Sequence, residues 1–211
     1  MKKVITQMNL PRGRPRDQHA DTKILEAALR LLEQHGFRAV TLEGIAEEAG
    51  VARTTVYRRW PNKAAVVMDA FLTHAAPRIA FPEHPVAVER LRLQMQLLAR
   101  AFRQEPGLLI RALIAEAQFD EELRAAVHDG WIVKRRASAK AIIEGAILAG
   151  ELPNDTNADA LLDALYGGLY YWLLIDHEVL TEAYVDSLFA TVLGPLTPTA
   201  QSKRGNRRNK S

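Results

Sequence analysis

Basic, hydroxyl and aromatic side chains follow one another closely between positions 53 and 63 of this sequence. They are Arg53, Thr54, Thr55, Tyr57, Arg58, Arg59 and Lys63. Arginine, lysine and hydroxyl groups donate hydrogen bonds to phosphate oxygens, and an arginine can also donate two bonds to the edge of a guanine. The side chains of this segment are therefore suited to binding both the phosphate backbone and the base edges of DNA.

The residues just before this segment predict how it is presented. A short helix is expected over 41–48, with Thr41 as its N-cap and the small Ala46 in its middle, and Gly50 can adopt the positive φ of a tight turn. A second short helix is expected over about 53–60. Apolar residues are spaced to pack between the two helices: Ile45, Ala49, Val51 and Val56. This is the pattern of a helix-turn-helix, whose second helix enters the major groove.

The run TLEGIAEEAGVARTTVYRRWPNK resembles the DNA-binding domain of the tetracycline-repressor (TetR) family, with Trp60 in place of the commoner phenylalanine. The matching positions are Thr41, Ile45-Ala46, Ala49-Gly50-Val51, Thr55, Tyr57, Trp60 and Lys63. The resemblance implies that Arg53 and Thr54 face base edges. It also implies phosphate contacts by Thr55, Tyr57 and Lys63, whereas Arg58 and Arg59 could contact either, and Thr41 could touch a phosphate. The alternatives are a solvated charge for each arginine and an edge-of-core ring for Tyr57.

Charge is distributed unevenly along the chain. Residues 1–63 hold 12 Lys and Arg against 7 Asp and Glu, residues 64–199 hold 11 against 18, and residues 200–211 hold 5 against none. Two basic ends flanking an acidic middle predict a polyanionic partner for the ends only.

The N-terminal basic segment resembles an AT-hook, a Gly-Arg-Pro core flanked by basic residues. Such an extended chain can lie in the narrow minor groove of A·T-rich DNA. The candidate minor-groove contacts are Arg12, Arg14 and Arg16. The alternative is a solvated basic tail.

Helical periodicity with no period-two stretch predicts an all-α fold. Helices are expected to begin near Asp21 or Thr22, at Asn62, at Val86, at Leu108, at Glu121, at Asp155 or Asn157 and at Thr181, with Pro106-Gly107 ending the one from Val86. We expect a disordered basic arm over 1–18, a helix-turn-helix domain over 19–63, a helical effector-binding and dimerisation domain over 64–197, and a disordered basic tail over 198–211. In the TetR family, the helix after Asn62 joins the two domains.

The helix expected from Asn157 is apolar around its whole circumference in its second half. Such a helix must be buried on two sides, and we expect one side to pack on a second copy, giving the four-helix homodimer interface of the TetR family. The candidate interface residues are Leu161, Leu165, Gly167, Gly168, Trp172, Val185 and Phe189. The alternative is an unusually buried helix within a monomer.

The resemblance also implies an effector pocket between the helices of the second domain. Candidate lining residues are Phe102, Leu109, Phe119, Trp131, Tyr166 and Tyr170, and candidate polar contacts are Arg111, Glu116 and His128. The alternative, which the large apolar character of these side chains favours, is that each lining residue belongs to the ordinary core.

Enzymatic chemistry finds no support in the sequence. The chain has no Cys, no phosphate-binding loop, no His-Glu-x-x-His pair and no Gly-x-Ser-x-Gly motif. We therefore expect no enzyme, no cofactor and no metal site. No apolar run at the N-terminus is long enough for a signal sequence, and the longest apolar stretch, from Leu165 to Ile175, is too short to span a membrane. A cytoplasmic location is therefore expected by default.

These features together predict a sequence-specific DNA-binding transcriptional regulator. We expect a homodimeric repressor that binds a palindromic operator and is released by a small-molecule effector. The alternatives are a regulator of the same fold that activates or needs no ligand, and an architectural DNA-binding protein, which would not explain the large acidic helical domain.

Overall fold

The computed structural model describes residues 18–176 and 178–194, and the residues in these ranges form ten α-helices and no strand. The all-α prediction is confirmed. The proposed minor-groove arm with Arg12, Arg14 and Arg16 and the tail over 198–211 lie outside the described residues.

Three helices make up the N-terminal part of the fold. They are α1 (Gln18–Ala39), α2 (Leu42–Glu48) and α3 (Arg53–Tyr57). The remaining elements are α4 (Lys63–Ala75), the 3₁₀ turn η1 (Ala76–Arg78), α5 (Ala87–Phe102), α6 (Glu105–Glu116), α7 (Glu121–Val127), the π-helical turn η2 (His128–Val133), α8 (Lys134–Leu148), α9 (Ala158–Ile175) and α10 (Glu182–Leu193).

Side-chain caps fix the starts of several helices where the sequence predicts them. Thr41 Oγ1 accepts from the Gly44 amide at 3.0 Å, and Asn62 Oδ1 accepts from the Ala65 amide at 2.9 Å. Asn157 and Thr181 cap α9 and α10 in the same way. Each cap satisfies a backbone N–H that has no partner within its helix, so the local sequence determines these boundaries.

Two boundaries differ from those predicted. The helix expected from Leu108 begins at Glu105, because Pro106 lies in the first turn of α6, where proline has no helical hydrogen bond to lose. The first helix begins at Gln18, before the predicted caps Asp21 and Thr22, and its regular geometry is interrupted at Gly36.

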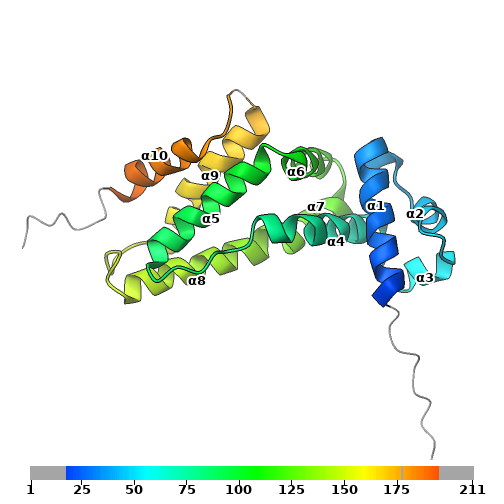
Figure 1. The fold of residues 1–211 in the computed structure, drawn as a ribbon, viewed down its shortest axis with the longest axis horizontal. Coiled ribbons are helices and arrows are strands. Elements are labelled where there is room, and N and C mark those ends of the chain that lie inside the picture. The colour runs from blue at the N-terminus through cyan, green and yellow to red at the C-terminus, as the bar shows by residue number, and fades with distance from the viewer. Residues whose placement is uncertain (1–17, 177, 195–211) are drawn as a thin grey trace, which may run out of the picture.

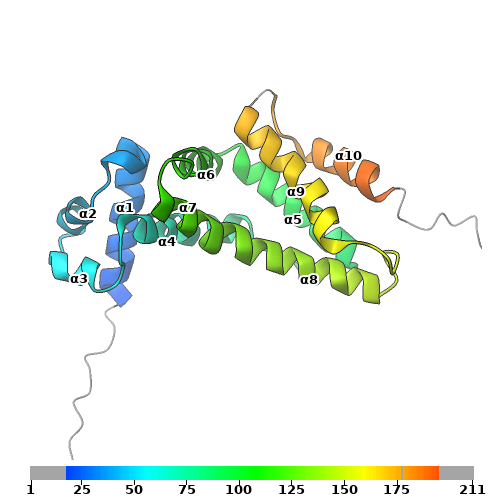
Figure 2. The ribbon, with the colours of Figure 1, turned by 180° about the vertical axis from the view of Figure 1, so that it is seen from behind.

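The helices are arranged along an elongated molecule. Figures 1 and 2 both show α1, α2 and α3 at one end and α9 and α10 toward the other. Between them, α4 packs against α1 on one side and against α6, α7 and η2 on the other. The rings of Phe71 on α4 and Trp131 on η2 lie 5.2 Å apart between their centroids. The helix after Asn62 therefore connects the two ends of the fold.

Four residues predicted to lie at the dimer interface are instead core residues of the helical body, so that prediction is corrected. Leu161, Leu165, Val185 and Phe189 are buried within the chain itself, where α9 and α10 pack on each other and on α5. These four side chains present almost no surface to a second copy, because the apolar stripe of each helix faces its own neighbours.

The two glycines of α9 have different surroundings. A Cβ at Gly168 would meet Leu188 and Tyr184 of α10 at 3.0 Å, so the close approach at this position is made within the chain. A Cβ at Gly167 would meet nothing within 4 Å. Trp172 stacks on Tyr184, with 4.3 Å between ring centroids.

None of the helices in the described part of the chain combines the length and the hydropathy that crossing a membrane requires.

Candidate nucleic-acid interface and ligand cavities

The exposed side of α3 carries the side chains predicted to contact DNA. Arg53, Thr54, Tyr57 and Arg58 are exposed, whereas Val56 is fully buried on the opposite side. Residues three and four apart lie on the same face of a helix, so the exposed residues form one surface. Thr55 is half-buried at its edge.

The turn before α3 sets the angle at which this surface is presented. Gly50 has a φ of 64°, in the left-handed region that disfavours side chains, and the Val51 amide donates to the Ala46 carbonyl at 3.0 Å. After α3, the buried Trp60 donates through Nε1 to Asp69 on α4 at 2.9 Å. The turn before α3 is therefore bonded to α2, and the turn after α3 is bonded to α4.

Tyr57 is held by a neighbour that the sequence did not identify. Its hydroxyl donates to Glu43 of α2 in a short hydrogen bond. This bond lowers the pKa of Glu43 below its usual value and raises the pKa of Tyr57. The site consequently contains a carboxylate that remains ionised beside the surface proposed to meet DNA phosphates.

Three predicted phosphate contacts also have roles inside the domain. Arg59 pairs with Asp21 of α1, which fastens the end of α3 to α1. Lys63 Nζ donates to the carbonyls of Phe37 and Arg38 at 3.2 and 3.3 Å, which leaves one of its three N–H groups for a phosphate. Thr41 accepts the capping bond through its oxygen, so its hydroxyl hydrogen can still be donated.

Four of the residues predicted to contact a ligand line two separate cavities in the helical body. One has a volume of about 580 Å³, and Phe102 and Arg111 lie on its wall with the first turn of α6. Arg111 there is paired with Asp176 at 2.5 Å. The other has a volume of about 360 Å³ between α8 and α9, and Tyr166 and Tyr170 lie on its wall.

The remaining predicted ligand residues lie elsewhere. Glu116 accepts from Arg38 Nε at 2.7 Å, between α6 and α1, and Leu109 is buried core. Phe119 is 84% exposed, and His128 is exposed beside Asp129. The prediction that Glu116, Phe119 and His128 line a ligand cavity is therefore corrected: none of the three lies on the wall of either cavity. Periodicity gives the face of a helix but not which neighbouring helix covers it.

Trp131 stands behind the smaller cavity. It is buried, and its Nε1 donates to the Tyr170 hydroxyl at 2.5 Å. The residue that sequence reasoning missed here is Arg135, which lines the cavity. The basic run Lys134-Arg135-Arg136 interrupts the apolar pattern of the long helix, and this interruption was the available indication.

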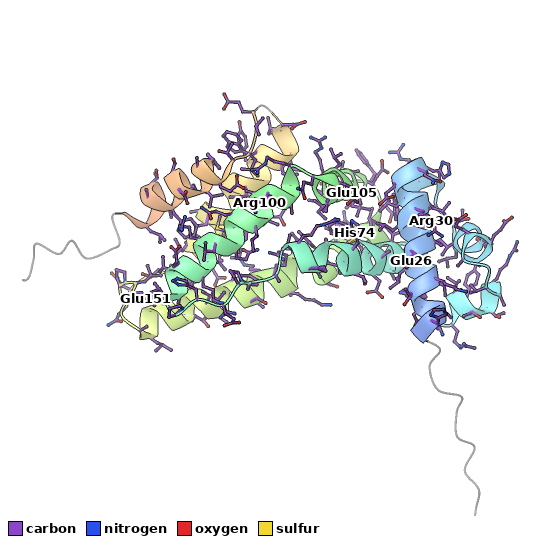
Figure 3. All side chains as sticks on the ribbon, viewed as in Figure 1. Glu26, Arg30, His74, Arg100, Glu105 and Glu151 are labelled. Carbon is purple, nitrogen blue, oxygen red and sulfur yellow. The ribbon has the colours of Figure 1, made fainter. Side chains whose placement is uncertain are left out.

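A polar link joins α4 to α6. Figure 3 labels its members His74 and Glu105, which lie next to each other between these two helices. His74 Nε2 lies 2.6 Å from Glu105 Oε2, and Arg78 Nη1 donates to the same oxygen at 3.2 Å. Within the described ranges, no group of three or more His, Asp or Glu side chains is placed to hold a metal ion.

Comparison with known proteins gives one consistent result. Residues 24–70 match the family model described as bacterial regulatory proteins, tetR family, and residues 81–192 match the model described as tetracyclin repressor-like, C-terminal domain.

Individual proteins are similar over most of the chain. The uncharacterized HTH-type transcriptional regulator YdeS of Bacillus subtilis is 38% identical over 181 residues, covering 86% of this chain and 91% of that protein. The DNA-binding transcriptional repressor TetR of Mycobacteroides abscessus is 26% identical over 182 residues, covering 84% and 94%. The crystal structure of the TetR family transcription regulator SCO0332 has a TM-score of 0.72 and 29% identity, covering 85% of this chain and 100% of that one.

Proposed function

This chain belongs to the TetR family of bacterial regulatory proteins and is a DNA-binding transcriptional regulator, and we propose that it is a homodimeric repressor that a small molecule releases from a palindromic operator. The observation that carries the proposal is the position of α4. It packs against α1 of the N-terminal part on one side and against α6, α7 and η2 of the helical body on the other.

In the proposed DNA complex, α3 enters the major groove. Arg53 and Thr54 contact base edges, and Tyr57, Thr55 and Arg58 contact the backbone. The exposure of Arg53 and Thr54 on the first turn of α3 supports this assignment, since the first residues of a recognition helix reach deepest. Thr41, which caps α2, and the remaining N–H donor of Lys63, at the start of α4, are proposed to add phosphate contacts on either side of α3. Arg12, Arg14 and Arg16 are proposed as minor-groove contacts.

The proposed dimer uses the outward face of α9 and the turn that follows it. Several large apolar side chains are exposed there: Tyr171, Leu174, Ile175 and Val179. Exposed apolar patches of this kind mark association surfaces, and a second copy packed on α9 and α10 would cover them. A monomeric mass in sedimentation at micromolar concentration would contradict the dimer.

Release follows from linkage between the two ends of the molecule. A ligand that binds better to the conformation whose two α3 helices cannot reach successive major grooves, roughly 34 Å apart, must weaken DNA binding. The contacts that would transmit the change are the Phe71–Trp131 ring contact and the His74–Glu105 link, because both join α4 to the helical body.

The direct test is a nuclease footprint of the purified protein on the DNA upstream of its own gene. We expect a protected palindrome with two half-sites one or two helical turns apart. Protection without sequence preference at moderate salt would favour an architectural DNA-binding protein instead.

A further inference from the structure

The cavity between α8 and α9 is apolar on most of its surface. Ile132 and Leu162 contribute to its wall, and at Gly167 no side chain fills the space. Its volume of about 360 Å³ is in the range of small-molecule sites. The cavity can therefore take a compact apolar ligand.

Arg135 lies on the wall of this cavity as a charge without a carboxylate partner among the described residues. Its Nη1 donates to the Ile79 carbonyl at 3.3 Å, and its guanidinium carbon lies 5.0 Å from the centroid of the Trp131 ring and 5.6 Å from that of Phe81. Its Nη2 is buried and has no acceptor within residues 18–176 and 178–194. Burial lowers the pKa of Arg135, yet an arginine keeps its proton in a protein.

The next residue provides an internal comparison. Arg136 lines the same cavity but donates to Asp163 at 2.5 Å and to Asp159 at 3.1 Å. Asp163, the one acidic side chain on the cavity wall, is therefore already neutralised by Arg136. The positive charge of Arg135 remains uncompensated.

A second donor in the cavity is the hydroxyl of Tyr170. It accepts the Trp131 Nε1 hydrogen at 2.5 Å, and no described residue accepts its own hydrogen. Tyr166 differs, because its hydroxyl already donates to the fully buried Gln94 at 2.7 Å. Burial raises the pKa of Tyr170, so this hydroxyl stays protonated and can donate.

We propose that the cavity between α8 and α9 binds an organic anion, a carboxylate carried on an apolar body, with Arg135 Nη2 and the Tyr170 hydroxyl as its hydrogen-bond donors. Unsatisfied buried donors cost free energy, and a carboxylate oxygen satisfies both donors and the charge at once. The inference names the chemical class of the effector and therefore rests on the proposed function.

The position of Arg135 explains how such a ligand acts on DNA binding. Arg135 holds the Ile79 carbonyl directly after η1, the turn that ends α4. The π-helical turn η2 precedes it, and π turns recur at functional sites. A carboxylate that draws the guanidinium into the cavity weakens its bond to Ile79 and shifts the end of α4.

The test uses octanoate as the anionic probe, 4-phenylbutyrate as an aromatic one, and octanol and octylamine as neutral and cationic controls. Binding to the full chain is measured by isothermal titration and by the shift in melting temperature. We expect at least one of the two carboxylates to bind about tenfold or more tightly than octanol, and octylamine not to bind. Equal binding of octanol and both carboxylates would overturn the proposal.

Three variants locate the anion. Arg135→Met should weaken carboxylate binding about tenfold to a hundredfold and leave octanol binding unchanged, and Tyr170→Phe should weaken it severalfold. Lys134→Met is the control: it removes an exposed charge of the same helix from a side chain that does not line the cavity, and it should change carboxylate binding little. Without ligand, Arg135→Met should melt at or above the temperature of the wild type, because it removes an unpaired buried charge. A large fall in that temperature, or retained carboxylate binding, would show that Arg135 is structural.

Operator binding in the presence of the probe separates this inference from the proposed function. If the carboxylate binds through Arg135 and releases DNA, both stand. Specific DNA binding together with no Arg135-dependent carboxylate binding overturns the ligand class alone. Carboxylate binding that leaves DNA affinity unchanged supports the cavity site and contradicts its role as the effector site.

Discussion

At the scale of single residues, Arg53 is the side chain expected to contribute most to sequence preference. It is exposed at the start of α3, where a guanidinium can donate to both acceptors of a guanine. Arg53→Ala should reduce operator affinity by about 1–3 kcal/mol, roughly fivefold to a hundredfold, and relax base preference at one position of each half-site. Fluorescence anisotropy with operator variants measures both effects.

Arg124→Ala provides the control for Arg53. Arg124 is an exposed arginine of α7, with only a 3.7 Å contact to Glu121. Its removal changes the same net charge far from α3 and should leave operator affinity within about twofold. An equal loss in both variants would mean that charge alone, and not the position of Arg53, governs binding.

For Glu43 we predict the opposite effect, a gain in operator affinity when its charge is removed. Its carboxylate holds Tyr57 and stays ionised because the hydrogen bond from Tyr57 lowers its pKa. Glu43→Gln removes a negative charge near the proposed phosphate contacts and should raise operator affinity about fivefold at low salt. The gain should diminish as salt is added, since salt screens exposed charges. Unchanged or weaker binding would contradict this role.

At the scale of elements, the adjacent glycines of α9 form a matched pair. Gly167→Ala should stabilise the protein by about 1 kcal/mol, because alanine favours a helix and the added methyl meets nothing within 4 Å. Gly168→Ala should give no such gain, because its methyl would meet Leu188 and Tyr184 at 3.0 Å. Urea unfolding of both variants tests the pair, and equal stabilisation would contradict the packing of α9 on α10.

The start of α10 gives a prediction about pH. Hydrogen bonds from Arg103 and Arg100 lower the pKa of Glu182 to about 2. Its contribution to stability is therefore complete above the ordinary value of 4.5 and is lost as pH falls toward 2. Glu182→Gln should reduce the free energy of unfolding at neutral pH by less than about 1 kcal/mol, since both ion pairs are partly exposed to solvent. The deficit should shrink as the pH falls below 4.5, and a constant deficit would contradict the ion pairs.

Element boundaries could be predicted where a local interaction sets them. Thr41, Asn62, Asn157 and Thr181 each cap a helix through an amide three residues ahead, so their role depends on the adjacent sequence alone. The start of α6 was predicted too late, because a proline such as Pro106 can either follow the end of a helix or occupy the first turn of the next one. The sequence pattern at Pro106-Gly107 is compatible with either.

The candidate sites could be predicted only where one helix presents the residues. Arg53, Thr54 and Tyr57 share one short helix, and their common surface follows from its period. Arg59, Lys63 and Glu116 have partners on α1, at separations along the chain that no local pattern encodes. Arg135 was missed for the same reason, because its environment is assembled from separate helices.

At the scale of the whole molecule, the helix-turn-helix and the proposed effector cavity belong to different parts of the fold. The helices α1, α2 and α3 lie at one end of an elongated fold (Figure 1), and α4 contacts both α1 and the helices of the body. A change in the body can therefore alter operator affinity without any contact to α3. The exposed apolar side chains of α9 and of the turn after it support the proposal that a pair of protomers acts on one operator.

The most direct test of this account is a titration of the footprinted operator and a scrambled duplex of the same composition with purified protein at moderate salt. We predict saturation at two protomers per operator and an affinity about a thousandfold or more above that for the scrambled duplex. Equal affinity for the two duplexes would contradict the central claim that this protein is a sequence-specific regulator, and saturation by a single protomer would contradict its action as a dimer.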